Sequence, residues 1–296
     1  MSASRAYRLK PKESLPEGLA RAARGRIDHA IDELHGKTDS TAEEAVHEAR
    51  KDMKKLRALL RLARGELGES TFERENTCFR DAGRELAAAR DSDVMLDTLN
   101  ALELPAGLAW DLRKGMQAHR ARNGAGSRHA AATGVVGMLR EARGRVDAWP
   151  LERDSFPALR DGLEGTYRRG RRDFKTSRAN PTVEGLHEWR KRVKELWYHH
   201  TLLRPLWPPV MEAVGDEAHE LADRLGDDHD LAVLAHWVRV HTSTDPEFFD
   251  AVDRRRTELQ ADAMTLGARL YADKPSAYVR RLGRLWKAVP TEVRAP

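Results

Sequence analysis

The sequence has little cysteine, few aromatic residues and no long apolar run. Cys78 is the only cysteine among 296 residues, which excludes an intrachain disulfide and a zinc site built on several cysteines. No uninterrupted apolar run approaches the roughly 20 residues that a membrane helix needs, and residues 1–10 lack the apolar stretch of a secretory signal. We therefore expect a soluble, cytoplasmic protein that does not associate with a membrane.

The charge is distributed unevenly along the chain. Lys and Arg number 52 and Asp and Glu number 47, so the formal net charge is only +5. Residues 50–64 nevertheless contain seven cations against one acid, and residues 168–194 contain ten cations against three acids. The local net charge of +7 in the second segment exceeds that of the whole chain. Where the charge lies is therefore more informative than its total.

Composition and proline placement predict an all-α protein. Ala, Leu, Arg and Glu dominate, and all four are good helix formers, whereas strict alternation of apolar and polar residues is hard to find. The segments 14–16 and 155–157, each Ser-x-Pro, are typical of helix starts with a serine N-cap and proline in the first turn. Each half of the chain shows about four main helical stretches.

An internal repeat organises the chain. Ser14 returns as Ser155, 141 positions later, and the segment 46–51 (Val-His-Glu-Ala-Arg-Lys) returns 140 positions later as 186–191 (Leu-His-Glu-Trp-Arg-Lys). A nearly constant offset predicts a duplication. We expect two four-helix bundles related by a pseudo-twofold axis, formed by residues 12–150 and 151–290.

One helix in each half carries a row of cations beside its apolar stripe. In the predicted helix 41–64, apolar residues recur at steps of three and four from Val46 to Ala63. The cationic row follows one position later and comprises His47, Arg50, Lys54, Arg57 and Arg61, with Lys51 close by. In the predicted helix 183–204 the row comprises His187, Arg190 and Lys194, with Lys191 close by. The preceding segment adds Arg168, Arg169 and Arg172.

Such rows favour a polyanionic ligand. Like charges at i, i+4 on a helix repel one another and destabilise the helix by about 0.2–0.5 kcal/mol per pair. A polyanion would offset this repulsion, since phosphate oxygens accept charge-assisted hydrogen bonds from Arg and Lys. A solvated basic face is the alternative. Because only 6% of the residues are aromatic and the rows carry no interleaved stacking rings, we expect nucleic acid to bind only weakly.

These helices resemble the two signature helices of the CHAD family, the conserved-histidine α-helical domain. The resemblance rests on residues 47–57 and 187–198, on the segments 90–94 and 225–233 that follow them, and on the C-terminal segment 274–286. It implies inorganic polyphosphate as the ligand, a shared groove or channel between two bundles, and association with polyphosphate granules. It also implies a binding role for Tyr198. Trp197 stands where the family often has Arg, so the second row is expected to be one cation shorter.

The histidines and nearby acids allow two interpretations. His47 and His187 either donate hydrogen bonds to phosphate or are buried histidines paired with carboxylates such as Asp91 and Asp230. If they meet phosphate, we expect tighter binding below about pH 6.5 than at pH 8. For Asp91 and Asp230 we expect a supporting role that orients Arg or His. A metal site at His229 is disfavoured because no His-Glu-x-x-His pattern occurs, and we expect neither metal nor cofactor.

The sequence thus predicts a protein that binds inorganic polyphosphate without being an enzyme. The alternatives are a metal-assisted phosphohydrolase that uses the cluster around His229, and a nucleic-acid-binding protein. Self-association into a homo-oligomer is left open by the sequence.

Overall fold

The structure is a computed structural model that describes residues 5–10, 12–86, 91–122, 126–242 and 246–289; the side chains of 91–93, 119–122 and 126–131 lie outside the description. Within these residues there are eleven α-helices, two short 3-10 helices and no strand, which confirms the all-α class. The first half holds α1 (Leu15–Leu34), α2 (Ala42–Leu62), α3 (Arg64–Glu85), α4 (Asp91–Asn100), α5 (Ala106–Arg122), α6 (Gly126–Arg145) and the 3-10 helix Val146–Ala148. The second holds α7 (Pro157–Ala179), α8 (Val183–Leu202), the 3-10 helix Arg204–Leu206, α9 (Pro208–His241), α10 (Pro246–Leu270) and α11 (Pro275–Ala288).

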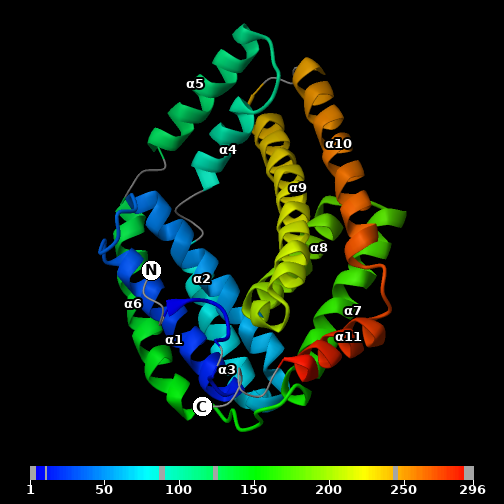
Figure 1. Ribbon diagram of the computed structural model, residues 1–296. Coiled ribbons are helices and arrows are strands. Elements are labelled where there is room, and N and C mark those ends of the chain that lie inside the picture. Colours follow the sequence, from blue (N-terminus) through cyan, green and yellow to red (C-terminus); the bar gives the residue numbers. More distant parts are fainter. Residues whose placement is uncertain (1–4, 11, 87–90, 123–125, 243–245, 290–296) are drawn as a thin grey trace.

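The two halves of the chain meet at two places. At one end of the molecule, α2 and α3 pack against α7 and α8 within the larger of two hydrophobic cores (Figure 1). At the other end, α4 and α5 pack with α9 and α10 around a smaller core that includes Leu112, Leu234 and Phe248. Both cores therefore draw on residues 12–150 and on residues 151–290. The internal duplication remains a prediction from the sequence.

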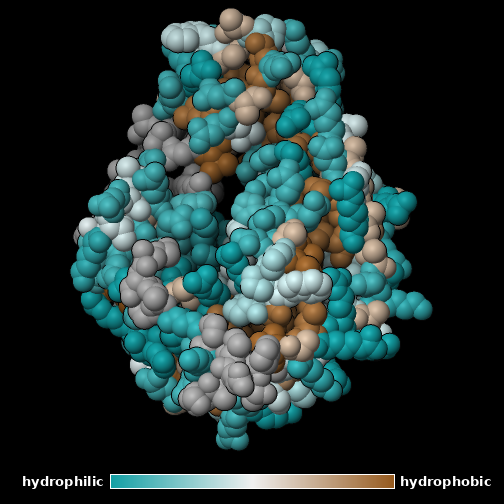
Figure 2. All heavy atoms as spheres, in the orientation of Figure 1, coloured by the Kyte–Doolittle hydropathy of each residue, from teal (hydrophilic) through white to brown (hydrophobic). Residues whose placement is uncertain are grey.

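Figure 2 shows the surface hollowed between α2 and α9, with hydrophilic side chains on either side of the hollow. None of the described helices is both long and apolar enough to cross a membrane.

Local sequence signals set most of the helix starts. Ser14 caps α1 and Thr41 caps α2, each in a capping box with the glutamate three residues later. The prediction for Ser155 was wrong. The residue before the first turn of α7 is Phe156, whose side chain forms no capping hydrogen bond, although Pro157 does open the helix as predicted.

The predicted apolar stripes of α2 and α8 are confirmed as core faces. In α2, Ala49, Met53, Leu56 and Leu60 are fully buried and Val46 is half-buried. In α8 and just after it, the buried residues are Leu186, Trp189, Val193, Leu196 and Leu203. Burying a large aliphatic side chain contributes about 1.5–3 kcal/mol, so these faces fix the rotation of both helices and thereby the direction of their cations.

The C-terminal turn of α2 lies directly against α7. A Cβ atom built on Gly162 would lie 2.1 Å from the carbonyl oxygen of Leu62 and 2.6 Å from that of Arg61. Both neighbours are backbone atoms, which cannot rotate away as a side chain can. Only glycine therefore allows the two helices to approach this closely.

We expect Gly162→Ala to lower the free energy of unfolding by about 3 kcal/mol, because the added methyl group must push two helices apart. Urea denaturation followed by circular dichroism measures the change. Gly137→Ala is the matched control, since a Cβ at this helical position of α6 meets nothing within 4 Å. It should leave stability unchanged or raise it by up to about 1 kcal/mol. Equal stability of the two variants would contradict the close approach of α2 and α7.

Candidate anion-binding site

Helices α2 and α8 cross in the larger core, and buried polar contacts hold them together. The ring of His199 on α8 donates from Nε2 to the carbonyl oxygen of Ala58 on α2, at 2.9 Å. One turn earlier in α2, the carbonyl oxygen of Lys55 accepts a hydrogen bond from the hydroxyl group of Tyr7, also at 2.9 Å. The ring of Tyr7 in turn meets that of Tyr198 edge-on, with centroids 6.4 Å apart. The contact at Ala58 fixes the crossing point in the C-terminal half of α2.

The single acid within the cationic segment of α2 is turned away from the predicted row. Asp52 is 1% exposed and faces α1, where its carboxylate accepts from Nδ1 of His29 at 2.6 Å and from Arg26 at 3.2 Å. Lys55 lies 3.7 Å from the same carboxylate. Asp52 therefore joins α1 to α2, while His47, Arg50 and Lys54 follow another face of α2.

A central site lies between α2, α8 and α9; we define it by Lys51, His187, Arg190 and Lys194. Burial, together with the charges of Arg190 and Lys51, lowers the pKa of Lys194 to about 8. Asp223 and Asp230 of α9 oppose this shift. Because Lys51 belongs to α2, cations of both halves share one environment here.

Arg190 is seated against the backbone of α9. Its Nε donates to the carbonyl oxygen of Ala222 at 3.1 Å. A Cβ atom on Gly226 would lie 2.3 Å from one terminal nitrogen of the same guanidinium, so glycine at this position leaves the room that Arg190 occupies. Glycine at position 226 thus lets the guanidinium group of Arg190 keep this position. From there, its remaining N–H groups can serve a ligand.

The ring of His187 packs against that of His229 of α9, with centroids 4.1 Å apart and the ring planes tilted by 33°. Burial is the main reason that the pKa of His187 falls to about 4, followed by the charges of His229 and Lys191. Burial also lowers the pKa of His229. In the free protein His187 is therefore neutral at pH 6.5. The expected gain in affinity below pH 6.5 cannot come from His187 unless the ligand itself raises this pKa.

The α9 side of the central site carries carboxylates. Asp223, Asp227 and Asp230 recur at steps of four and three, and burial together with the other two acids raises the pKa of Asp227. The charge of Asp230 also acts on Lys194 and His229, where it favours their protonated forms. The side chain of Asp91, the other predicted supporting residue, lies outside the described residues.

On the other side of the α2–α8 crossing lies an arginine cluster, formed by Arg57, Arg61, Arg169 and Arg192 around Glu195. The carboxylate of Glu195 is 3.3 Å from Arg61, 3.7 Å from Arg169 and 2.7 Å from Arg192. Arg57 donates to the side chain of Asn76 at 3.1 Å. Burial, together with the charge of Arg61, lowers the pKa of Arg57 to about 10.

The structure therefore divides the predicted α2 row between two places. Lys51 belongs to the central site, whereas Arg57 and Arg61 belong to the arginine cluster. His47, Arg50 and Lys54 precede the crossing on α2, and each has an interaction within the protein. Tyr198 is 2% exposed and stacks on Trp197, which makes it a core residue of the crossing.

Several predicted cations have carboxylate partners within the protein, so part of their charge is already compensated. Lys51 pairs with Glu48 at 2.8 Å, and Lys191 pairs with Glu188 at 2.5 Å. On α7, the exposed Arg168 pairs with Glu164, and Arg172 pairs with Asp173. These pairs join residues of the same helix and are partly or fully solvated, so each contributes about 0–1 kcal/mol and can be exchanged for a stronger ligand.

Sequence reasoning missed Glu195 and Arg192 of the arginine cluster. The spacing from Arg192 to Glu195 indicates an i, i+3 pair, but nothing in the sequence predicts that Arg61 and Arg169 come to the same carboxylate. No group of three or more His, Cys, Asp or Glu side chains that could hold a metal ion occurs among the described residues.

The fold and the site define an all-α protein in which cations from helices of both halves collect where those helices cross. A family model described as the CHAD domain matches residues 21–239. The chain therefore belongs to the CHAD family. It is similar to the crystal structure of the CHAD domain from the plant Ricinus communis, with a TM-score of 0.65 and 18% sequence identity over 97% of this chain and 96% of that one. That likeness concerns the fold alone. No curated protein matches the chain.

We expect Glu195→Gln to lower the free energy of unfolding by about 1–2 kcal/mol, because three arginines lose their shared carboxylate. Partial exposure of the arginines limits the loss. Urea denaturation measures it. Glu188→Gln is the control on the same helix; this carboxylate is 52% exposed, so its removal should cost less than about 0.5 kcal/mol. If Glu195→Gln is no less stable than the control, the cluster does not depend on Glu195.

Proposed function

We propose that the protein binds inorganic polyphosphate at the central site and along the neighbouring turns of α2, without cleaving it. The observation that carries this proposal is the largely buried ammonium group of Lys194, on which the like charges of Arg190 and Lys51 both act. This arrangement is unfavourable in the free protein, since like charges repel and burial removes water from them. A chain of phosphates would supply the missing counter-charge along its whole length.

The geometry supports a linear polyanion over a compact anion. The α2 cations His47, Arg50 and Lys54 rise along the helix by about 1.5 Å per residue, so they span roughly 10 Å before the crossing. Lys194 and Arg190 continue the set on α8. A ligand with a repeated charge can follow these positions in sequence, whereas a single phosphate reaches only two or three. Association with polyphosphate granules would follow from such binding.

We expect Lys54→Gln combined with Lys194→Gln to weaken the binding of long-chain polyphosphate at least tenfold, which corresponds to about 1.4 kcal/mol. Isothermal titration calorimetry at physiological ionic strength measures the change, and circular dichroism checks the helical content. The control is Lys114→Gln with Arg254→Gln, which removes the same charge from exposed positions on α5 and α10. Equal affinity of the two double variants would place the ligand elsewhere.

Affinity should also depend on pH through Lys194. Its pKa of about 8 means that the free protein loses this charge between pH 7 and pH 9, while a bound polyanion holds the proton in place. Affinity should therefore fall about tenfold over this range. Lys194→Arg keeps its charge throughout and should show a clearly smaller fall. An identical fall in both proteins would remove Lys194 from the site.

Direct assays distinguish the proposed function from two alternatives. A metal-assisted phosphohydrolase would shorten long-chain polyphosphate during incubation with Mg²⁺ or Mn²⁺, which gel electrophoresis would show. A nucleic-acid-binding protein would release polyphosphate to competing RNA at physiological salt. We expect unchanged chain length and weak competition.

A further inference from the structure

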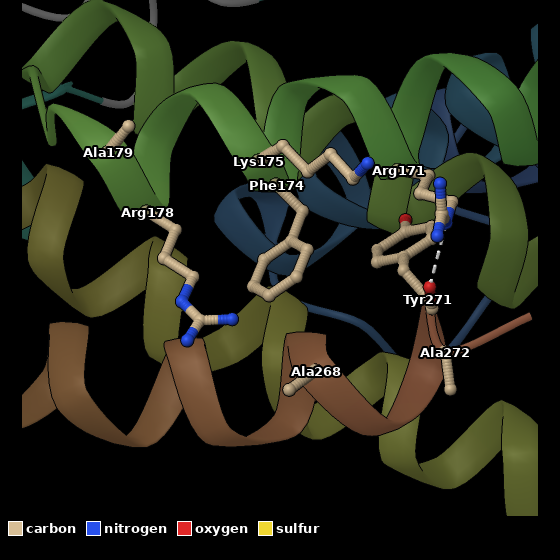
Figure 3. A pocket seen from close by; sticks show the side chains of 8 residues that line it. All are labelled: Arg171, Phe174, Lys175, Arg178, Ala179, Ala268, Tyr271 and Ala272. Carbon is tan, nitrogen blue, oxygen red and sulfur yellow. Dashed lines mark hydrogen bonds between the residues drawn. The ribbon is translucent and has the colours of Figure 1, made fainter.

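A pocket of about 480 Å³ lies between the C-terminal turns of α7 and the end of α10. Three cations of α7 line it, Arg171, Lys175 and Arg178. Figure 3 shows Lys175 extending towards Arg171 at one end, and Arg178 reaching over α10 at the other, with the ring of Phe174 between them. The pocket is separate from the central site and from the arginine cluster, because Arg169 faces Glu195 while these cations face α10.

The three cations form no ion pair with any carboxylate that the structure describes. Arg171 is held by a hydrogen bond from its Nε to the backbone carbonyl oxygen of Tyr271, at 3.1 Å (Figure 3). By contrast, Arg168 and Arg172 on the adjoining surface of α7 both pair with acids. The pocket therefore concentrates positive charge that the described part of the chain does not neutralise.

The floor of the pocket is apolar and fixed. Phe174 and Tyr271 are buried and lie with ring centroids 6.2 Å apart, and three alanines complete the lining: Ala179, Ala268 and Ala272. Close packing of α7 on α10 holds the rings in place. A Cβ on Gly170 would lie 2.3 Å from the hydroxyl oxygen of Tyr271, and one on Gly267 would lie 2.8 Å from the ring of Phe174.

We infer that this pocket binds a small organic phosphate that carries a flat ring, of the nucleoside polyphosphate class. The cations from Arg171 to Arg178 span about 10 Å along α7, which suits several charged groups in a row. The aromatic and alanine floor suits a ring, and an inorganic phosphate chain would gain nothing from it. The volume lies within the range of small-molecule sites, roughly 300–1,000 Å³.

The test uses ATP and tripolyphosphate as probes in isothermal titration calorimetry without added metal. Lys175→Glu combined with Arg178→Glu should weaken ATP binding at least tenfold, weaken tripolyphosphate binding clearly less, and leave the affinity for long-chain polyphosphate at the central site unchanged. Arg254→Glu, an exposed charge reversal elsewhere on α10, is the control and should bind ATP like the parent. Circular dichroism checks that each variant is folded.

A second variant opposes the positive charge of the pocket while all three cations remain. Ala268 is exposed on α10, so Ala268→Glu should fold normally, since Glu is a good helix former. Its carboxylate should neutralise the pocket and weaken ATP binding at least tenfold. The inference is overturned if ATP affinity survives both variants, or if tripolyphosphate binding falls as much as ATP binding. The latter result would show that the ring contributes nothing and that the site takes inorganic phosphate.

Discussion

The crossing of α2 over α8 is the constraint on which the arrangement of cations depends. His199 donates to the carbonyl oxygen of Ala58, and this buried contact joins residues from opposite halves of the chain. Moving α2 along or around its axis would leave the imidazole without its partner in a region that water does not reach, which costs about 1–3 kcal/mol. The crossing point is thereby held in register. The α2 row must then pass from one side of α8 to the other.

The two sides compensate positive charge in different ways. In the arginine cluster one buried carboxylate, Glu195, is shared by three guanidinium groups at close range. In the central site, Asp223 and Asp230 lie across from Lys194 on α9 and lessen, without cancelling, the fall of its pKa. Because Glu195 already neutralises part of the charge of three arginines, we interpret the arginine cluster as a structural contact between helices. The central site keeps more of its unfavourable charge for a ligand, which is why the proposed function is placed there.

Much of the fold could be predicted because its determinants are local. The stripe from Ala49 to Leu60 and the capping box at Thr41 depend on residues three and four positions apart, so the sequence alone was enough to predict α2 and its buried face. The row of cations was predicted in the same way. Its division was not, since only the tertiary crossing decides that the charge of Lys51 acts on Lys194 while Arg61 pairs with Glu195. Ser155 failed as a cap because Phe156 occupies the position before the first turn.

Helix α9 ties the central site to both cores. Its 34 residues supply the carbonyl oxygen of Ala222 and the space at Gly226 that seat Arg190, while Leu234, further along, is buried in the smaller core. A long helix held at both ends resists bending, because bending would break backbone hydrogen bonds or expose apolar surface. The position of α9 beside the central site is thus fixed by packing in both cores. An anion that binds Lys51 and Lys194 cannot displace α9, so the ligand must adopt a shape that fits the site.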